Sequence, residues 1–192
     1  MHASDFYAHF DSEVAIDAPL LMMKLNSFLP TDIVIFDLWE VRVDAHARFD
    51  AVSRTYQYHV CNHRQPFRNG LFGRIFFEPD VEAMNVAAHA LMEYVDFTSF
   101  SKLHTQTKTN NCELMEAHWD VVDGEYVFTI RSNRFLRNMV RSITGTLLDV
   151  GRGKLSVDDV RGIVEQRDRC AAGVSMPAEG LFLTRVEYPE GW

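Results

Sequence analysis

Cysteine is scarce in this chain, and so is any long apolar run. The three cysteines, Cys61, Cys112 and Cys170, are odd in number, lie far apart and form no C-x-x-C pair. Neither a disulfide framework nor a zinc site is therefore indicated. No apolar run approaches the ~20 residues of a membrane-spanning helix, and the first residues lack the basic start and apolar centre of a secretory signal. We expect no membrane partner and a cytoplasmic location.

Several catalytic and organisational signals are also absent. The eight histidines show no H-E-x-x-H spacing, so we predict no metal site. No G-x-S-x-G elbow marks a serine nucleophile. The sequence has no internal repeat and no linker rich in glycine, serine or proline. Any boundary between lobes must then be a short crossing within a continuous fold.

The composition is that of an ordinary globular protein with an acidic balance. Of the 192 residues, 47% are hydrophobic and 12% aromatic, which is enough for one core or for two small lobes that share one. A net charge of −8 argues mildly against a nucleic-acid partner. Between Arg131 and Lys154, however, six basic residues stand against one acid, Asp149. This segment is a local basic patch in an acidic chain.

The pattern of apolar residues predicts a strand, a helix and a strand before residue 45. Alternation indicates a strand over residues 5–10, helical spacing indicates a helix over residues 18–29 that stops before Pro30, and a second strand falls within residues 32–42. We place the boundary between the lobes near residues 43–51, and divide the chain into residues 1–45 and 46–192.

The remainder of the chain predicts hairpins and helices in turn. Asp123-Gly124 is a strong hairpin signal between two alternating segments, and Gly151 is expected to close a helix as a left-handed cap. We expect an α+β fold with an antiparallel or mixed sheet and helices on one face. The predicted elements are strands over residues 53–62, 114–122, 126–132 and 180–189, and helices beginning after Asp80, at Asn133 and at Ser156.

The helix predicted from Asn133 concentrates basic side chains. At 100° per residue, Arg134, Arg137 and Arg141 fall on a narrow arc opposite the apolar face. Such a stripe is either a solvated helix face or a set of phosphate ligands, and periodicity alone leaves both interpretations open. Tyr56 and Tyr58 share one face of their strand, where a tyrosine either edges a core or stacks on a base.

Four segments together resemble the tRNA pseudouridine synthase A family. They are "HARFDAVSRTYQYHVCN", "DFTSFSK", "FLRNMVRSITGTLLDVGRGK" and "PAEGLFLTRVEYP", in the family's order and at matching separations. The resemblance extends over essentially the whole chain. It implies a pseudouridine-synthase-like α+β fold, with residues 1–45 as the remnant of an N-terminal lobe and residues 46–192 as the C-terminal lobe.

The resemblance also implies an activity and a set of site residues. The family converts uridine to pseudouridine in the anticodon stem-loop of tRNA, at positions thirty-eight to forty, as a homodimer and without a cofactor. Tyr56 falls at the tyrosine that contacts the target base, and Arg54 at the arginine that precedes it. Arg141 falls at the arginine that pairs with the catalytic aspartate. We further expect Arg134, Arg137, Arg152 and Lys154 to contact RNA phosphates.

One family motif is represented only by its end. Of the G-R-T-D-x-G-V/M-H-A loop that carries the nucleophilic aspartate, only Met1-His2-Ala3 is present. We therefore expect an N-terminally truncated synthase that is inactive alone. The alternative is a non-catalytic tRNA-binding protein derived from the synthase, and a metal-dependent enzyme or plain structural domain ranks far behind both.

Overall fold

The computed structural model describes residues 1–102 and 108–192. Packing divides the chain into two units: unit 1 holds residues 1–6 and 51–187, and unit 2 holds residues 7–50 and 188–192. Each unit is described by itself. The two lobes expected from the family resemblance are defined by homology and not by packing, so their boundary at residues 45 and 46 stays a prediction.

Unit 1 is built on a mixed β-sheet. The strands follow the order β1-β6-β2-β5-β4, and β3 pairs with the end of β2. The pairs β1–β6 and β2–β3 are parallel, and the other pairs are antiparallel. The strands are β1 (His2–Ala3), β2 (Ser53–Cys61), β3 (Gly73–Arg74), β4 (Leu114–Val122), β5 (Glu125–Ser132) and β6 (Leu181–Glu187).

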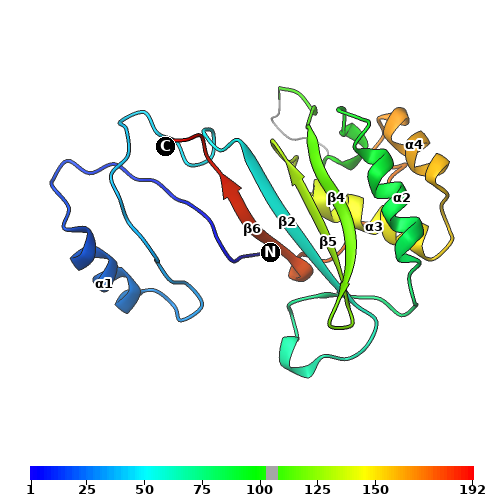
Figure 1. Ribbon diagram of the computed structural model, residues 1–192, viewed down its shortest axis with the longest axis horizontal. Coiled ribbons are helices and arrows are strands. Elements are labelled where there is room, and N and C mark those ends of the chain that lie inside the picture. The colour runs from blue at the N-terminus through cyan, green and yellow to red at the C-terminus, as the bar shows by residue number, and fades with distance from the viewer. Residues whose placement is uncertain (103–107) are drawn as a thin grey trace. The chain divides into compact units, whose positions relative to one another are not determined.

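Three helices of unit 1 lie on one side of this sheet (Figure 1). They are α2 (Val81–Leu91), α3 (Met139–Gly151) and α4 (Val157–Gln166). The predicted α+β class, with a mixed sheet and helices on one face, is confirmed. Within the described residues, no helix has the length and apolar character needed to cross a membrane.

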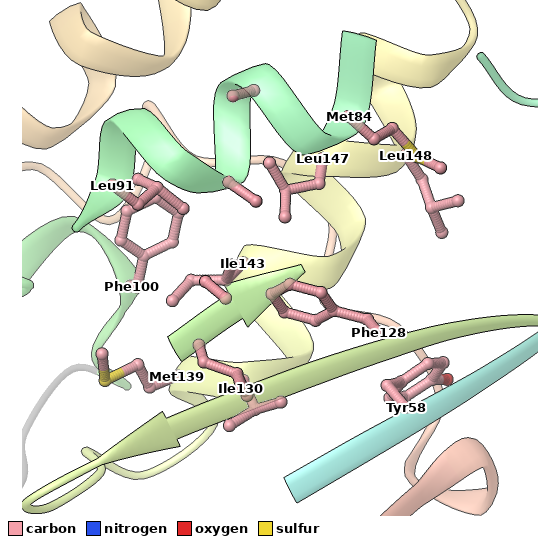
Figure 2. Packing of buried hydrophobic residues seen from close by; sticks show 14 of the residues in the cluster. Tyr58, Met84, Leu91, Phe100, Phe128, Ile130, Met139, Ile143, Leu147 and Leu148 are labelled. Carbon is pink, nitrogen blue, oxygen red and sulfur yellow. The ribbon is translucent and has the colours of Figure 1, made fainter. Parts of the chain in front are cut away.

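The core lies between the sheet and α3. Phe128 and Ile130 of β5 and Ile143 and Leu147 of α3 have no exposed surface. Figure 2 shows these side chains together, with Tyr58 of β2 beside them. Burying side chains of this size stabilises a fold by roughly 1.5–3 kcal/mol each, so this layer is the main source of stability in unit 1.

Turn and cap residues lie at the predicted ends of the β4–β5 hairpin and at the predicted starts of α2 and α4. Asp123 and Gly124 both have positive φ, 50° and 79°, as the two-residue turn between β4 and β5 requires. The Asp80 carboxylate accepts a hydrogen bond from the Ala83 amide and caps α2. Ser156 and Asp159 form a capping box at the start of α4.

Unit 2 contains one helix, α1 (Ala18–Phe28), and no strand among its described residues. The helix confirms the predicted helix: Asp17 caps its start and it ends before Pro30. None of the residues of α1 is buried. Phe28 and Phe36 are 88% and 78% exposed, so unit 2 leaves large apolar side chains in water.

Two predicted strands are wrong. Residues 5–10 and 32–42 alternate as strands do, but the structure gives them no regular secondary structure. The short strand near the start is His2–Ala3, which pairs with Phe182 and Leu183 of β6. A strand is stable only when its backbone pairs with a neighbour, and the described residues provide none for these two segments.

The central helix also differs from its prediction. It begins at Met139, after Asn138 in the left-handed conformation (φ 70°), and not at Asn133. Gly151 lies inside the helix, and the positive φ falls on Gly153. A Cβ at Gly151 would lie 2.7 Å from the Met84 sulfur. Glycine is needed here for close packing of α3 on α2, not for a cap.

Candidate functional site

Strand β2 presents Arg54 and Tyr56, two of the residues predicted for base binding. The Arg54 guanidinium donates from Nη1 to the carbonyl oxygens of Ala51 and Asn133, both at 2.9 Å. This contact ties the loop before α3 to the start of β2. From that loop Phe135 meets the Tyr56 ring edge to face, with 5.1 Å between ring centres. Arg54 and Phe135 thereby fix the position of the Tyr56 ring.

Burial controls the protonation of the two tyrosines on this face of β2. Removal from water raises the pKa of Tyr56, and the positive charge of Arg54 opposes the shift in part. Burial also raises the pKa of Tyr58 above its ordinary value, against the nearby charge of Arg141. Both phenols therefore remain protonated near neutral pH. Tyr58 is a core residue whose hydroxyl donates to the Pro177 carbonyl oxygen at 2.6 Å.

Arg141 stands in the first turn of α3, a helix buried almost all round. Of the thirteen residues of α3, all except Arg141 and Asp149 are buried. The Arg141 Nε donates to the Met176 carbonyl oxygen at 2.5 Å. Within the described residues, Nη1 and Nη2 of Arg141 have no hydrogen-bond or ion-pair partner. Among the described residues, the outer edge of this guanidinium is thus unpaired.

The predicted arginine stripe does not form on one helix face. Arg134 and Arg137 precede α3, and Arg141 alone lies within it. Arg152 and Lys154 follow its other end, where both approach Asp149, at 4.0 and 3.8 Å. The two pairs are therefore separated by about the length of α3, roughly 20 Å at 1.5 Å per residue.

No group of three or more metal-ligating side chains occurs in the part of the chain that the structure describes. Cys61 and Cys112 are buried and Cys170 is exposed, all with free thiols. The Cys61 sulfur approaches Nδ1 of His63 at 3.2 Å. Burial raises the pKa of the Cys112 thiol to about 11. This thiol is therefore a poor nucleophile at neutral pH.

Comparison of the sequence with known proteins identifies a family. The family profile described as tRNA pseudouridine synthase matches residues 87–189. The tRNA pseudouridine synthase A of Bacteroides thetaiotaomicron is 53% identical over 193 residues, which span 99% of this chain and 72% of that protein. The chain belongs to the tRNA pseudouridine synthase family.

Other relatives that carry the name tRNA pseudouridine synthase A match this chain over the same extent. That of Bacteroides fragilis is 54% identical across 99% of this chain and 76% of its own length. That of Exiguobacterium sibiricum is 38% identical across 99% of this chain and 76% of its own length. The resemblance noted in the sequence is therefore confirmed, and the activity of the family is that of an isomerase acting on tRNA uridine.

The sequence interpretation missed the segment that holds Arg141. Residues 173–177, here called the strap, lie along α3 and supply the Met176 carbonyl. One signal was present in the sequence: Gly145 stands inside a helix, where glycine is costly and indicates that another backbone approaches closely. The identity of the approaching segment could not be read from that signal.

Proposed function

We propose that this chain carries the base-binding and arginine-bearing side of a site that isomerises uridine to pseudouridine in the anticodon stem-loop of tRNA. Tyr56 contacts the target base, Arg54 supports it, and Arg141 pairs with the catalytic aspartate of the family. The observation that carries the proposal is the combination on unit 1 of a fixed, protonated Tyr56 with an Arg141 whose outer guanidinium edge is unpaired among the described residues.

The chemistry requires these residue types. Breaking the glycosidic bond places charge on both the sugar and the base, so the attacking carboxylate needs a fixed cation to hold it ionised and aimed. Arginine does this without risk of deprotonation. A tyrosine ring packs on uracil, and its hydroxyl lies near the carbon that must lose a proton when the base is rejoined through C5. No cofactor is needed for this sequence of steps.

We also propose that these 192 residues alone do not catalyse the reaction. The aspartate of the G-R-T-D-x-G-V/M-H-A motif does not occur among them. Asp5, Asp44 and Asp96 match no nucleophile of the family.

The test compares two purified proteins on a tRNA with uridines in its anticodon stem-loop. One is the 192-residue chain, and the other is the same chain joined to the N-terminal segment of the Bacteroides thetaiotaomicron relative that contains the motif. We expect no pseudouridine from the first and conversion by the second. Conversion by the 192 residues, or none by the extended chain, contradicts the proposal.

A second candidate is a non-catalytic tRNA-binding protein, because these 192 residues do not include the motif aspartate. It predicts tRNA binding by both proteins and no conversion by either. The extended chain thus separates the two candidates.

RNA binding is assigned to Arg134, Arg137, Arg152 and Lys154. Because the two pairs lie at opposite ends of α3, we propose that they contact phosphates in two separate stretches of the RNA. Replacing Arg134 and Arg137 by alanine is expected to weaken tRNA binding and to reduce the slope of log K against log salt by about 1–2. The matched control replaces Arg161 and Arg185, each of which is ion-paired to a glutamate, and should leave the slope unchanged. If the slope for the first variant is unchanged, Arg134 and Arg137 are solvated surface residues that do not contact RNA phosphates.

Three further properties follow from the family and are proposed here. The protein works as a homodimer in the cytoplasm, and its halves are an N-terminal lobe (residues 1–45 of this chain) and a C-terminal lobe (residues 46–192). Sedimentation equilibrium of the extended chain should give twice the mass of one chain. A monomer across the concentration range of the assay contradicts the dimer.

A further inference from the structure

Three of the five strap residues, Gly173, Val174 and Met176, approach α3 closely. The Gly173 amide donates to Oγ1 of Thr146 at 3.0 Å, and the Met176 amide donates to the Arg141 carbonyl oxygen at 3.1 Å. With the bond from Arg141 Nε to the Met176 carbonyl, residue 176 both donates to and accepts from Arg141. The end of the strap is held by the Tyr58 hydroxyl through the carbonyl oxygen of Pro177.

Gly145 permits this approach. A Cβ built on Gly145 would lie 1.9 Å from the Val174 carbonyl oxygen, far inside any real contact. The strap backbone therefore occupies the volume that any side chain at position 145 would fill. Glycine inside a helix is less favourable than alanine, and its presence here is explained by the strap.

Ser175 is anchored by two side chains from outside the strap. Its Oγ accepts from Nδ2 of Asn138 at 2.5 Å and from Nη2 of Arg169 at 2.8 Å. Asn138 is the left-handed residue that precedes α3, so the serine links the strap to the start of the helix that carries Arg141. The carbonyl of the next residue, Met176, is fixed as a result.

We propose that the strap is a positioning element for Arg141. The Met176 carbonyl accepts the hydrogen bond of the Nε–H and so prevents a carboxylate from binding the Nε edge of the guanidinium. The outer edge, formed by Nη1 and Nη2, is left for the catalytic carboxylate. Arginine binds carboxylates through either edge, and the strap selects the outer one. The inference rests on the proposed function, in which Arg141 pairs with that carboxylate.

The first test measures the geometry in the 192-residue chain itself. Proton exchange of the Arg141 Nε–H with water, followed by NMR, should be slower than that of the exposed Arg137. In Ser175→Ala, which removes the acceptor of both anchors, the Arg141 exchange should rise toward that of Arg137. Equal exchange rates for the two arginines in the unaltered chain would overturn the assignment.

The second test uses the extended chain and separates rate from binding. Ser175→Ala and Gly145→Ala should lower kcat about tenfold or more, because misplacing a catalytic group by about 1 Å costs up to 10²-fold. The KM for tRNA should change less than about twofold, since the strap contacts no proposed RNA ligand. The matched control is Gly162→Ala in α4, where a Cβ meets nothing closer than 3.9 Å, and it should retain full activity.

A double-mutant cycle distinguishes positioning from general structural damage. In an Arg141→Lys background, which lacks the Nε–H that the strap engages, Ser175→Ala should have little additional effect on kcat. Additive effects would overturn the strap proposal and leave the role of Arg141 intact. If Arg141→Lys itself left kcat unchanged, the proposed role of Arg141, and not only the strap, would fail.

Discussion

Unit 1 buries a cluster of large apolar side chains, and unit 2 buries none of comparable size. In unit 1, the described residues place phenylalanines, isoleucines and leucines between a sheet and α3 with no surface in water. In unit 2, α1 buries none of its residues, Val43 is fully exposed and Phe36 is 78% exposed. Apolar residues occur in both units, but among the described residues no element packs on α1 closely enough to bury them.

The order that unit 2 does have comes from a small cluster around Asp50. The Asp50 carboxylate accepts from Nη2 of Arg42, from the His46 amide and from Nε1 of Trp192, all within 3.0 Å. The Trp192 ring stacks on Tyr188 with 3.8 Å between ring centres. Polar anchoring and aromatic stacking thus hold unit 2 where a buried aliphatic core is missing from its described residues.

The largest expected contrast is between core and exposed phenylalanines. Phe128→Ala in unit 1 should lower the free energy of unfolding by about 3–5 kcal/mol, because it leaves a cavity beside α3. Phe36→Ala in unit 2 removes a ring that is 78% exposed and should change it by less than about 0.5 kcal/mol. Urea denaturation followed by circular dichroism measures both. Equal losses would mean that unit 2 has a core of its own.

A smaller contrast is expected between the helix caps. Asp80→Ala removes the cap of α2, a helix packed on the sheet, and should destabilise unit 1 by about 1 kcal/mol. Asp17→Ala removes the corresponding cap of α1 and should leave the unfolding midpoint of unit 1 unchanged. In both variants, the substitution removes an aspartate carboxylate that accepts a hydrogen bond from a backbone amide in the first turn of a helix. A shift of the unit 1 midpoint in Asp17→Ala would show that α1 stabilises it.

The smallest expected effect is that of acid pH on the cluster around Asp50 in unit 2. The hydrogen bond from the His46 amide, with those from Trp192 and Arg42, lowers the pKa of Asp50 to about 2. A lowered pKa in the folded state contributes stability above the ordinary pKa, and that contribution is lost as pH falls through the folded value. The Trp192 indole N–H resonance should therefore shift between about pH 4 and pH 2. Asp50→Asn should show no such step, and a step unaffected by this substitution contradicts the assignment.

The sequence was informative where the partners of an element are close in the chain. The hairpin at Asp123-Gly124 and the helix start at Ser156 were predicted because turn and cap chemistry is local. The strands predicted over residues 5–10 and 32–42 failed because alternation describes a side chain pattern and not the presence of a neighbouring strand. The start of α3 was placed too early because Phe135 and Leu136 continue the apolar spacing through a loop.

The same distinction applies to the site. Arg54, Tyr56 and Arg141 could be named because they stand within recognisable motifs. The strap could not, because its role depends on a main-chain carbonyl, that of Met176, brought to Arg141 by a fold contact across 35 residues of sequence. Gly145, inside the helix, and Gly173, in the strap, mark the positions where the second backbone passes close to α3.

The central claim is that unit 1 holds the base-binding and arginine side of a uridine-isomerising site. The most direct measurement maps pseudouridine in a tRNA treated with the extended chain, comparing the unaltered protein with Arg141→Ala and with Arg161→Ala as the control. We predict pseudouridine at uridines of the anticodon stem-loop for the unaltered protein and for Arg161→Ala, and none for Arg141→Ala. Conversion by Arg141→Ala at the unaltered rate, or modification confined to another part of the tRNA, would contradict the account.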